Sequence, residues 1–424
     1  MFAFKGRFIL VTLMYCFMVS SLNRRDVLKA AGAVSIVGLA GCVDGEGADF
    51  SYGVLMPETG DLGSLGQTIR DGAILPARQL DGETELVFQA QTGNTDTDPQ
   101  TGISEANSMV DAGISAFVGP AASNVNIQVA EEVFIPNQVV GISPSSTAPS
   151  VTDLDDDGYI FRTCPSDALQ GQVMADVAID RLGASSASTL FLNDDYGQAL
   201  ASEFVTAFEN GGGDILAEVS FESEQPSYSS EIDSALDDDP DVLMIVGFPE
   251  SGIQLFRDFY DSYDDDDVDI LVPDGLIDPD LPGEVNNDME NVIGTQPSAD
   301  GPGADFFADL YEDEFGSSPT VFNGQAYDAA AVAILAYVAA EDDSGTAIRD
   351  EIRTIANPGG EVVGPSNLEE AVALVADGEE IEYQGASSTV EFDDNGDITS
   401  SAYDIVEFSG GEITVVDTIT FEAE

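Results

Sequence analysis

The 424-residue chain contains no histidine and no tryptophan, and it has three cysteines. The lack of histidine excludes Ser-His-Asp and Cys-His catalysis and any His-ligated metal site. Basic residues are scarce as well, with 12 Lys and Arg against 80 Asp and Glu, which gives a formal net charge of −68. Because no basic patch can form, nucleic acid is not expected as a partner.

The cysteines are Cys16, Cys42 and Cys164. If the N-terminal segment before Cys42 is removed and Cys42 is modified, Cys164 alone remains as a free thiol. We therefore expect no internal disulfide.

The first 41 residues have the pattern of an export signal. Arg24 and Arg25 precede an apolar run that ends in Leu39-Ala40-Gly41-Cys42. Twin arginines before a moderately apolar segment are typical of a Tat signal, and the last four residues look like a lipobox, whose cysteine is lipidated. Residues 30–39 are too short for a membrane span, which needs about 20 apolar residues. An anchor helix with chance arginines is the alternative.

We therefore predict a signal peptide in residues 1–41 and a tether in residues 42–49. The protein is expected on the extracellular face of the cell membrane, held by lipid on Cys42. Without residues 1–41 the chain loses five basic residues and one acid, Asp26, so that 79 acids, seven arginines and no lysine remain, a net charge of −72.

Such a charge is typical of the surface of an extreme halophile, because molar salt shortens the Debye length to about 3 Å and screens the self-repulsion. Disorder caused by high charge is the alternative. We reject it because 43% of the residues are hydrophobic and they fall in periodic segments.

Apolar strands alternate with amphipathic helices along residues 50–272, which predicts an α/β fold with parallel sheets covered on both faces. About 375 residues exceed one core, so two lobes are expected. The C-terminal part of the chain, from residue 389 on, is instead predicted to form strands joined by Asn-Gly and Gly-Gly turns. The predicted helices are 66–80, 99–112, 124–134, 170–182, 199–210 and 251–260; the predicted strands are 51–56, 86–90, 114–118, 139–142, 188–192, 215–221, 242–247, 270–272, 389–392, 402–408 and 413–421.

Polar residues gather after several of these strands, where open parallel sheets bind ligands. Residues 119–124 and 143–147 supply hydroxyls and free amides that suit an anion, and Asp274 after a later strand suits an ammonium. Tyr196 and Phe248 can stack over a side chain or a cation. Each residue also has an ordinary explanation, since Ser and Asn commonly cap helices and Asp274 is one of 80 acids.

The acidic loop 153–158 has the spacing of the start of a calcium loop. The twelfth position is Cys164 rather than glutamate, so the ligand set of such a loop is incomplete. We interpret it as an acidic surface loop and predict no metal.

Seven short segments occur in order along the chain. They are residues 59–63 (TGDLG), 118–120 (VGP), 142–149 (ISPSSTAP), 161–171 (FRTCPSDALQG), 195–197 (DYG), 273–275 (PDG) and 323–329 (NGQAYDA). With these segments the chain resembles the type I periplasmic solute-binding proteins of the branched-chain amino acid (Leu/Ile/Val-binding protein) family, over roughly residues 50–422.

The resemblance implies two Rossmann-like lobes joined by a three-strand hinge, with the ligand between them. It implies lobe boundaries at 50–162 with 296–391, and at 163–295 with 392–424. The family's first-lobe disulfide is missing.

The resemblance also implies a ligand site. Ser123, with Ala122 beside it, corresponds to the serine that contacts the ligand carboxylate, and Ser145, Ser146 and Thr147 lie on the segment that binds both carboxylate and ammonium. Asp274 matches the acid that pairs with the ammonium. Tyr196 matches a second-lobe tyrosine, Phe248 stands where tyrosine is usual, and Leu62 or Leu65 lies where some members carry an aromatic residue.

The implied function is the lipid-anchored receptor of an ABC importer that binds a small amino acid or related solute and works with permease and ATPase subunits, without a cofactor. A ligand-sensing module for a signalling partner is the alternative, and genes for a permease and an ATPase beside this one would favour the importer. A hydrolase is disfavoured, because the chain beyond residue 41 has neither histidine nor lysine as a general base.

The net charge generates a first prediction. When salt falls from molar to about a tenth molar, the Debye length grows to about 10 Å, and self-repulsion should expand or unfold the protein. Far-UV circular dichroism and the thermal midpoint report the change. Identical signals and midpoints at both salt concentrations would contradict the prediction.

Overall fold

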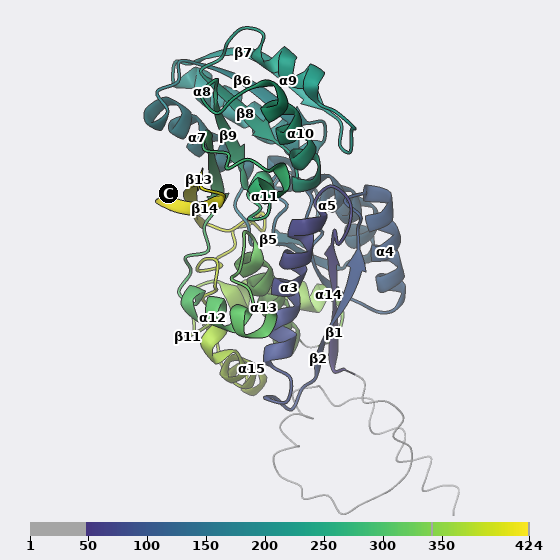
Figure 1. Cartoon of the computed structure of the whole chain (residues 1–424). Coiled ribbons are helices and arrows are strands. Elements are labelled where there is room, and N and C mark those ends of the chain that lie inside the picture. Colours follow the sequence, from purple (N-terminus) through teal and green to yellow (C-terminus); the bar gives the residue numbers. More distant parts are fainter. Residues whose placement is uncertain (1–47, 341, 423–424) are drawn as a thin grey trace, which may run out of the picture.

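A computed structural model describes residues 48–340 and 342–422. The chain forms two lobes stacked end to end, each built on its own sheet (Figure 1). We call lobe 1 the part built on the five-stranded sheet and lobe 2 the part built on the seven-stranded sheet. The predicted export signal lies outside the described residues.

The sheet of lobe 1 has the order β2-β1-β3-β4-β5 and is parallel throughout. Strands β3 and β4 are buried along their whole length and β1 is buried except at Ser51, as expected of a parallel sheet covered on both faces. The strands are β1 (Phe50–Met56), β2 (Phe88–Asn94), β3 (Ala116–Val118), β4 (Val140–Ser143) and β5 (Ile160–Arg162).

The sheet of lobe 2 has the order β14-β13-β10-β9-β8-β6-β7. The five strands from β10 to β7 are parallel, whereas β13 and β14 join antiparallel at one edge. The strands are β6 (Ser186–Leu192), β7 (Asp214–Phe221), β8 (Val242–Val246), β9 (Asp269–Pro273), β10 (Val292–Pro297), β13 (Ser400–Ser409) and β14 (Glu412–Glu422). A small sheet pairs β11 (Glu361–Val363) with β12 (Ile381–Tyr383).

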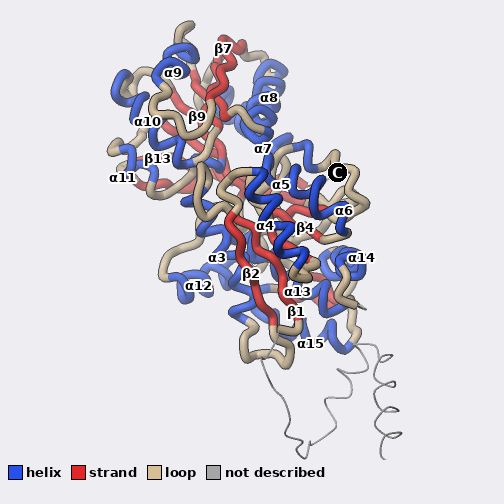
Figure 2. The backbone as a smooth tube through the Cα atoms, turned by 90° about the vertical axis from the view of Figure 1, so that its right-hand side faces the viewer, coloured by secondary structure: helices blue, strands red, loops and turns tan. Residues whose placement is uncertain are grey.

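Helices flank both large sheets (Figure 2). In lobe 1 these are α3 (Gly63–Gln79), α4 (Pro99–Asp111), α5 (Ser123–Val129), which continues as a π-helix (Ala130–Phe134) into α6 (Ile135–Asn137), α12 (Ala304–Phe315), α13 (Asn323–Ala339), α14 (Gly345–Ala356) and α15 (Leu368–Asp377). In lobe 2 these are α7 (Asp167–Asp176), which continues as a π-helix (Val177–Arg181), α8 (Asp195–Asn210), α9 (Ser229–Leu236), α10 (Pro249–Ser262) and α11 (Leu281–Val285).

Helix α13 forms the centre of lobe 1. All 17 of its residues are buried, and it packs against α3, α14, α15 and the strands β1, β3 and β4. A helix that is buried all round has no exposed polar face to produce a periodic pattern. For this reason no helix is predicted there from the sequence. Its many alanines let the neighbouring helices approach closely.

The chain passes between the two sheets three times. It leaves β5 for α7 through residues 163–166, returns from β10 to α12 through residues 298–303, and passes again to β13 before residue 400. Asp328 of α13 fixes residues 383–387, the segment that leads toward the last passage. Its buried carboxylate accepts bonds from Ala386 N, Ser387 N and the Tyr383 hydroxyl.

The α/β architecture with two lobes and parallel sheets is confirmed, and so are the two C-terminal strands with their Gly410-Gly411 turn. The predicted strand at 389–392 is wrong. Phe392 makes a single bridge to Ile398, and Val390 has a φ of 53°, which is incompatible with a regular strand. The strand predicted at 86–90 begins two residues later and continues to Asn94.

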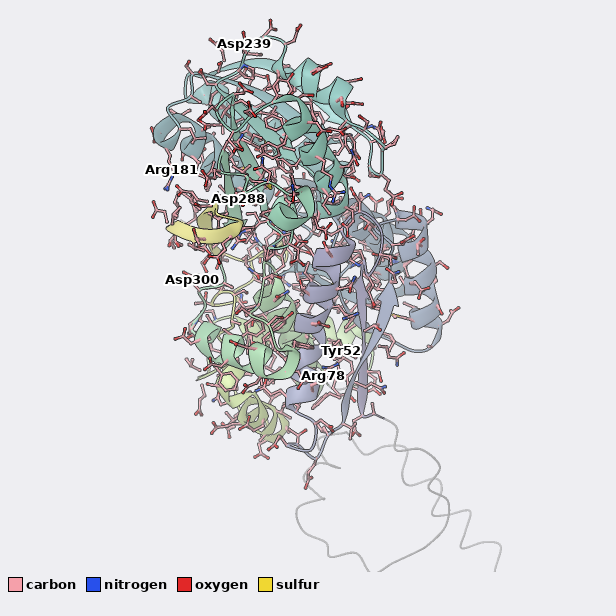
Figure 3. All side chains as sticks on the ribbon, viewed as in Figure 1. Tyr52, Arg78, Arg181, Asp239, Asp288 and Asp300 are labelled. Atoms are coloured by element: carbon pink, nitrogen blue, oxygen red, sulfur yellow. The ribbon has the colours of Figure 1, made fainter. Side chains whose placement is uncertain are left out.

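The surface is acidic on both lobes. Figure 3 shows carboxyl oxygens projecting outward around the molecule, with Asp239, Asp288 and Asp300 labelled as examples. In the acidic loop 153–158, Asp156 accepts bonds from Gly158 N and Ile160 N and so closes its own turn. No helix within residues 48–340 or 342–422 combines the length and apolar character needed to cross a membrane.

Candidate ligand-binding site

A small cavity lies between the lobes, at the carboxyl ends of strands from both sheets. Its lining from lobe 1 is Leu62, Leu65, Ile69, Ala121, Ala122, Ser123, Ser145 and Phe322, and from lobe 2 it is Tyr196, Phe248, Asp274 and Gly275. The sequence-predicted residues Leu65, Ala122, Ser123, Ser145, Tyr196, Phe248 and Asp274 therefore lie together around one space.

Two aromatic rings form the lobe 2 wall. The rings of Tyr196, at the start of α8, and Phe248, after β8, stack with centroids 5.3 Å apart and an angle of 7° between their planes. Gly275 allows the rings and the acid to approach, since a Cβ there would lie 2.5 Å from Gly247 O and 3.0 Å from the Tyr196 hydroxyl. A larger residue at this position would push the wall apart.

Asp274 lies beside this wall, in the turn after β9, and is 3% exposed. The Tyr196 hydroxyl donates to its Oδ2 over 3.4 Å, while its Oδ1 has no hydrogen bond of regular geometry among the described residues. Burial raises the pKa of Asp274 to about 6, although Gln170 and Tyr196 oppose the rise. A buried carboxyl with a free oxygen is a strong acceptor for a cationic donor.

Asp167 is a second buried carboxyl near Asp274, and the sequence analysis missed it. It is the first residue of α7 and fully buried, and neither side-chain oxygen has a hydrogen-bond partner of regular geometry in the described parts of the chain. Burial and the charge of Asp274 raise its pKa well above the usual range, and the Thr147 hydroxyl offsets part of the rise. Unsatisfied buried polar groups are rare, so this pair is a candidate for a ligand contact.

The serine-rich segment after β4 divides into two parts. Ser145 reaches the cavity, where its hydroxyl donates to Ala121 O over 3.2 Å. Ser146 and Thr147 are buried behind the cavity, and their carbonyls accept bonds from Arg162 Nη1 at 3.2 and 3.0 Å. Their own hydroxyls make no hydrogen bond of regular geometry among residues 48–340 and 342–422, although the Thr147 hydroxyl lies near enough to Asp167 to lower its pKa.

The part of the lobe 1 wall that lies at the start of α3 is apolar, since it consists of Leu62, Leu65 and Ile69. Phe322, at the N-terminus of α13, completes it with a left-handed φ of 65°, a conformation that is uncommon for a bulky residue. The cavity volume is about 20 Å³, which is the room needed for about one water molecule. A ligand of amino-acid size can enter only when the lobes move apart.

A family model described as "Periplasmic binding protein" matches residues 51–378.

The chain belongs to the periplasmic binding protein family.

Similar proteins support the type I, branched-chain amino acid group of this family. The chain is 24% identical to the Leu/Ile/Val-binding protein BraC3 of Rhizobium johnstonii over 87% of this chain and 94% of that protein. It is 28% identical to the chemotactic signal transduction system substrate-binding protein BasB of Halobacterium salinarum over 81% of this chain and 84% of that protein. In fold it is similar to the leucine-binding protein LivK of Thermotoga maritima, with a TM-score of 0.73, 23% identity and coverage of 87% and 98%.

These matches confirm the predicted family and the type I fold. Members of the periplasmic binding protein family bind solutes and are not enzymes, which also confirms the expectation that this chain is not an enzyme.

The opening of this periplasmic binding protein toward solvent is acidic on both lobes. A cavity of about 490 Å³ adjoins the ligand cavity at Phe248. Within the described residues, no group of three or more His, Cys, Asp or Glu side chains is arranged to hold a metal ion. The acids of the opening give it a negative potential that attracts cations. The acids that line it are Asp61, Asp96, Asp98, Asp194, Glu222 and Glu224.

The buried acids predict an unusual dependence of stability on pH. Burial raises the pKa of Asp274 and of Asp61 to about 6 and that of Asp194 to about 7. A raised pKa means that the folded state binds protons more tightly than the unfolded state. This contribution to stability is complete below about pH 4 and is lost as the pH rises through 6 to 7. In molar salt, the thermal midpoint should therefore be higher at pH 5 than at pH 8.

Thermal melts at fixed salt measure the effect, and Asp274→Asn should reduce its size. Carboxyls with a lowered pKa, such as Asp241, which accepts bonds from Ser185, contribute stability that is lost only when the pH falls below the ordinary value of 3.8. They therefore do not affect the comparison between pH 5 and pH 8. A midpoint that rises between pH 5 and pH 8 would refute the prediction.

Proposed function

We propose that this protein is the solute receptor of an ABC importer and binds a small amino acid or related solute between its lobes. The observation that carries the proposal is the cavity between the lobes, which sequence-predicted residues from both lobes line, Asp274 among them. The lobes are proposed to be residues 50–162 with 296–391, and 163–295 with 392–424, except that residues 296 and 297 complete β10 and so belong to lobe 2. They close over the ligand by movement at the three connecting segments.

Asp274 is proposed to bind the ligand's ammonium group, with Asp167 behind it. Both carboxyls are buried and have unpartnered oxygens among the described residues. An ammonium would supply the missing donors and the missing positive charge, and this offsets the cost of keeping carboxylates away from water. The stacked rings of Tyr196 and Phe248 add a favourable surface for a cation.

The ligand's carboxylate is proposed to bind at Ser123 and Ser145, at the ends of neighbouring strands in lobe 1. Ser123 Oγ accepts a bond from Ala148 N over 3.2 Å, so its own proton is free to be donated. The Ala122 position adds backbone amides, while Ser146 and Thr147 support this segment from behind. None of the cavity-lining residues is basic, so hydroxyls and amides would have to hold the anion.

The apolar wall of Leu62, Leu65 and Ile69 is proposed to receive the ligand's side chain. Matches to a Leu/Ile/Val-binding protein and to a leucine-binding protein support an aliphatic amino acid. We propose this class without naming one member of it.

Replacing Asp274 tests the proposal. Asp274→Asn removes the charge that would pair with the ammonium, and losing one partner of such a buried contact typically costs about 2–5 kcal/mol. Affinity for the amino acid selected from a screen of the twenty should fall roughly 30-fold or more. Calorimetry in molar salt measures the change.

Asp288→Asn is the matched control, because it makes the same charge change on the exposed surface of lobe 2. It should leave affinity unaltered. Equal affinity of Asp274→Asn and the parent would mean that the ligand has no ammonium at this position.

Lipid anchoring at Cys42 after export through Arg24 and Arg25 is also part of the proposal, and these residues lie outside the described ones. Cys42→Ser should release the protein into the medium or leave it uncleaved, because the attachment atom is lost. Mass spectrometry of the membrane fraction measures this, and a membrane form of unchanged mass would argue against the anchor.

A sensory role is the second candidate. The similarity to BasB, the substrate-binding protein of a chemotactic signal transduction system, favours it. A strain without this protein would lose solute uptake if it serves an importer, and would lose taxis toward the solute with uptake intact if it serves a sensor.

A further inference from the structure

At the opening between the lobes, each lobe supplies a carboxylate to the first turn of a helix in the other lobe. Asp61, just before α3, accepts bonds through Oδ1 from Ser251 N at 2.8 Å and Ser251 Oγ at 2.5 Å. Glu250 accepts a bond through Oε1 from Ser64 N at 2.8 Å. Ser251 and Glu250 belong to the first turn of α10 in lobe 2, and Ser64 belongs to the first turn of α3 in lobe 1.

Neither helix receives a side-chain cap from its own lobe, although Gly60 O accepts a bond from Gly63 N at the start of α3 over 3.0 Å. The residues that precede them, Leu62 for α3 and Phe248 for α10, make no side-chain capping bond. The first amides of a helix have no partner within it, and a carboxylate is a favourable partner for them. Elsewhere caps are local, as with Asp98 at α4 and Asp194 at α8. The helices α3 and α10 obtain side-chain caps only when the lobes are together.

The same two helix starts form the cavity wall. Leu62 and Leu65 line it from α3, and Phe248 lines it from the residue before α10. The reciprocal caps therefore hold in place the two helix starts that line the ligand cavity, although Asp61 and Glu250 do not line it themselves. Ser64 Oγ adds a third contact across the lobes, donating to Asp278 Oδ2 over 2.7 Å.

We propose that Asp61 and Glu250 are positioning residues for lobe closure. The reciprocal caps set the equilibrium between closed and open forms, and this equilibrium scales the apparent ligand affinity. The inference rests on the proposed solute-binding function only for its effect on affinity. The caps also act against repulsion, because the acids of the opening face one another across the lobes.

The test measures the distance between the lobes by pulsed electron spin resonance in molar salt. Spin labels at Glu132→Cys in lobe 1 and Glu209→Cys in lobe 2 use exposed positions. A Cys16→Ser, Cys42→Ser background and the burial of Cys164 restrict labelling to these sites. The parent should show a closed population without added ligand, because the caps need none.

Asp61→Ala and Glu250→Ala should each shift the distances toward the open form. Each should also weaken binding of L-leucine, the probe amino acid, by about 2- to 30-fold, which is the range expected for loss of one helix cap. Asp61→Asn should retain most of the closure, because asparagine also caps helices.

Asp98→Ala is the matched control. It removes an acid from the same opening, but its cap, from Thr101 N to Asp98 Oδ1 at 2.8 Å, lies within lobe 1. It should lower the thermal midpoint and leave the distances unchanged.

Parent-like distances in both Asp61→Ala and Glu250→Ala, or a parent with no closed population, would overturn the proposal. A shift in Asp98→Ala as large as in Asp61→Ala would also overturn it, because charge and not capping would then control closure. If L-leucine and the other amino acids fail to bind while the cap variants still open the lobes, the solute class is wrong and the caps stand.

Discussion

The buried guanidinium of Arg162 is the contact on which the arrangement of the site depends. Its Nε donates to Asp397 Oδ1 over 2.6 Å, and its Nη1 donates to the carbonyls of Ser146, Thr147 and Ala148. One side chain at the end of β5 thus fixes the segment that presents Ser145 to the cavity and holds it against the last passage between the lobes. Arg162 is the one basic side chain that is buried among the described residues. No second buried cation can therefore pair with Asp397 in its place.

The acidic character of the chain has different consequences on the surface and inside. Exposed acids are solvated and repel one another weakly in molar salt. Asp167 and Asp274 are removed from water, where salt screens them far less, and both have raised pKa values. The ligand site therefore holds two carboxyls that bind protons more tightly than the exposed acids do, and a cationic group of a ligand would have to displace those protons.

The positions of the strand ends could be predicted from the sequence because parallel topology brings them to one edge of each sheet. Ser123, Ser145, Tyr196 and Asp274 were found in this way. Asp167 lies in segment 161–171, which carries part of the family resemblance, but it was not singled out as a site residue because it starts a helix instead of following a strand. Tertiary contacts also decide that the carbonyls of Ser146 and Thr147 bind Arg162 while neither residue lines the cavity. They likewise decide that residues 389–392 make a single bridge instead of a strand.

The complete burial of α13 constrains the order in which the chain can fold. Lobe 1 begins at β1, yet its central helix spans Asn323–Ala339 and packs against β1, β3 and β4. During synthesis, the early strands must wait for this helix while all of β6 to β10 emerges. Lobe 1 cannot mature before strands β6 to β10 of lobe 2 have been made, and contacts of such long sequence separation form slowly. Until α13 arrives, the apolar face that it covers is open to aggregation, so the chain needs protection in the compartment where it is synthesised.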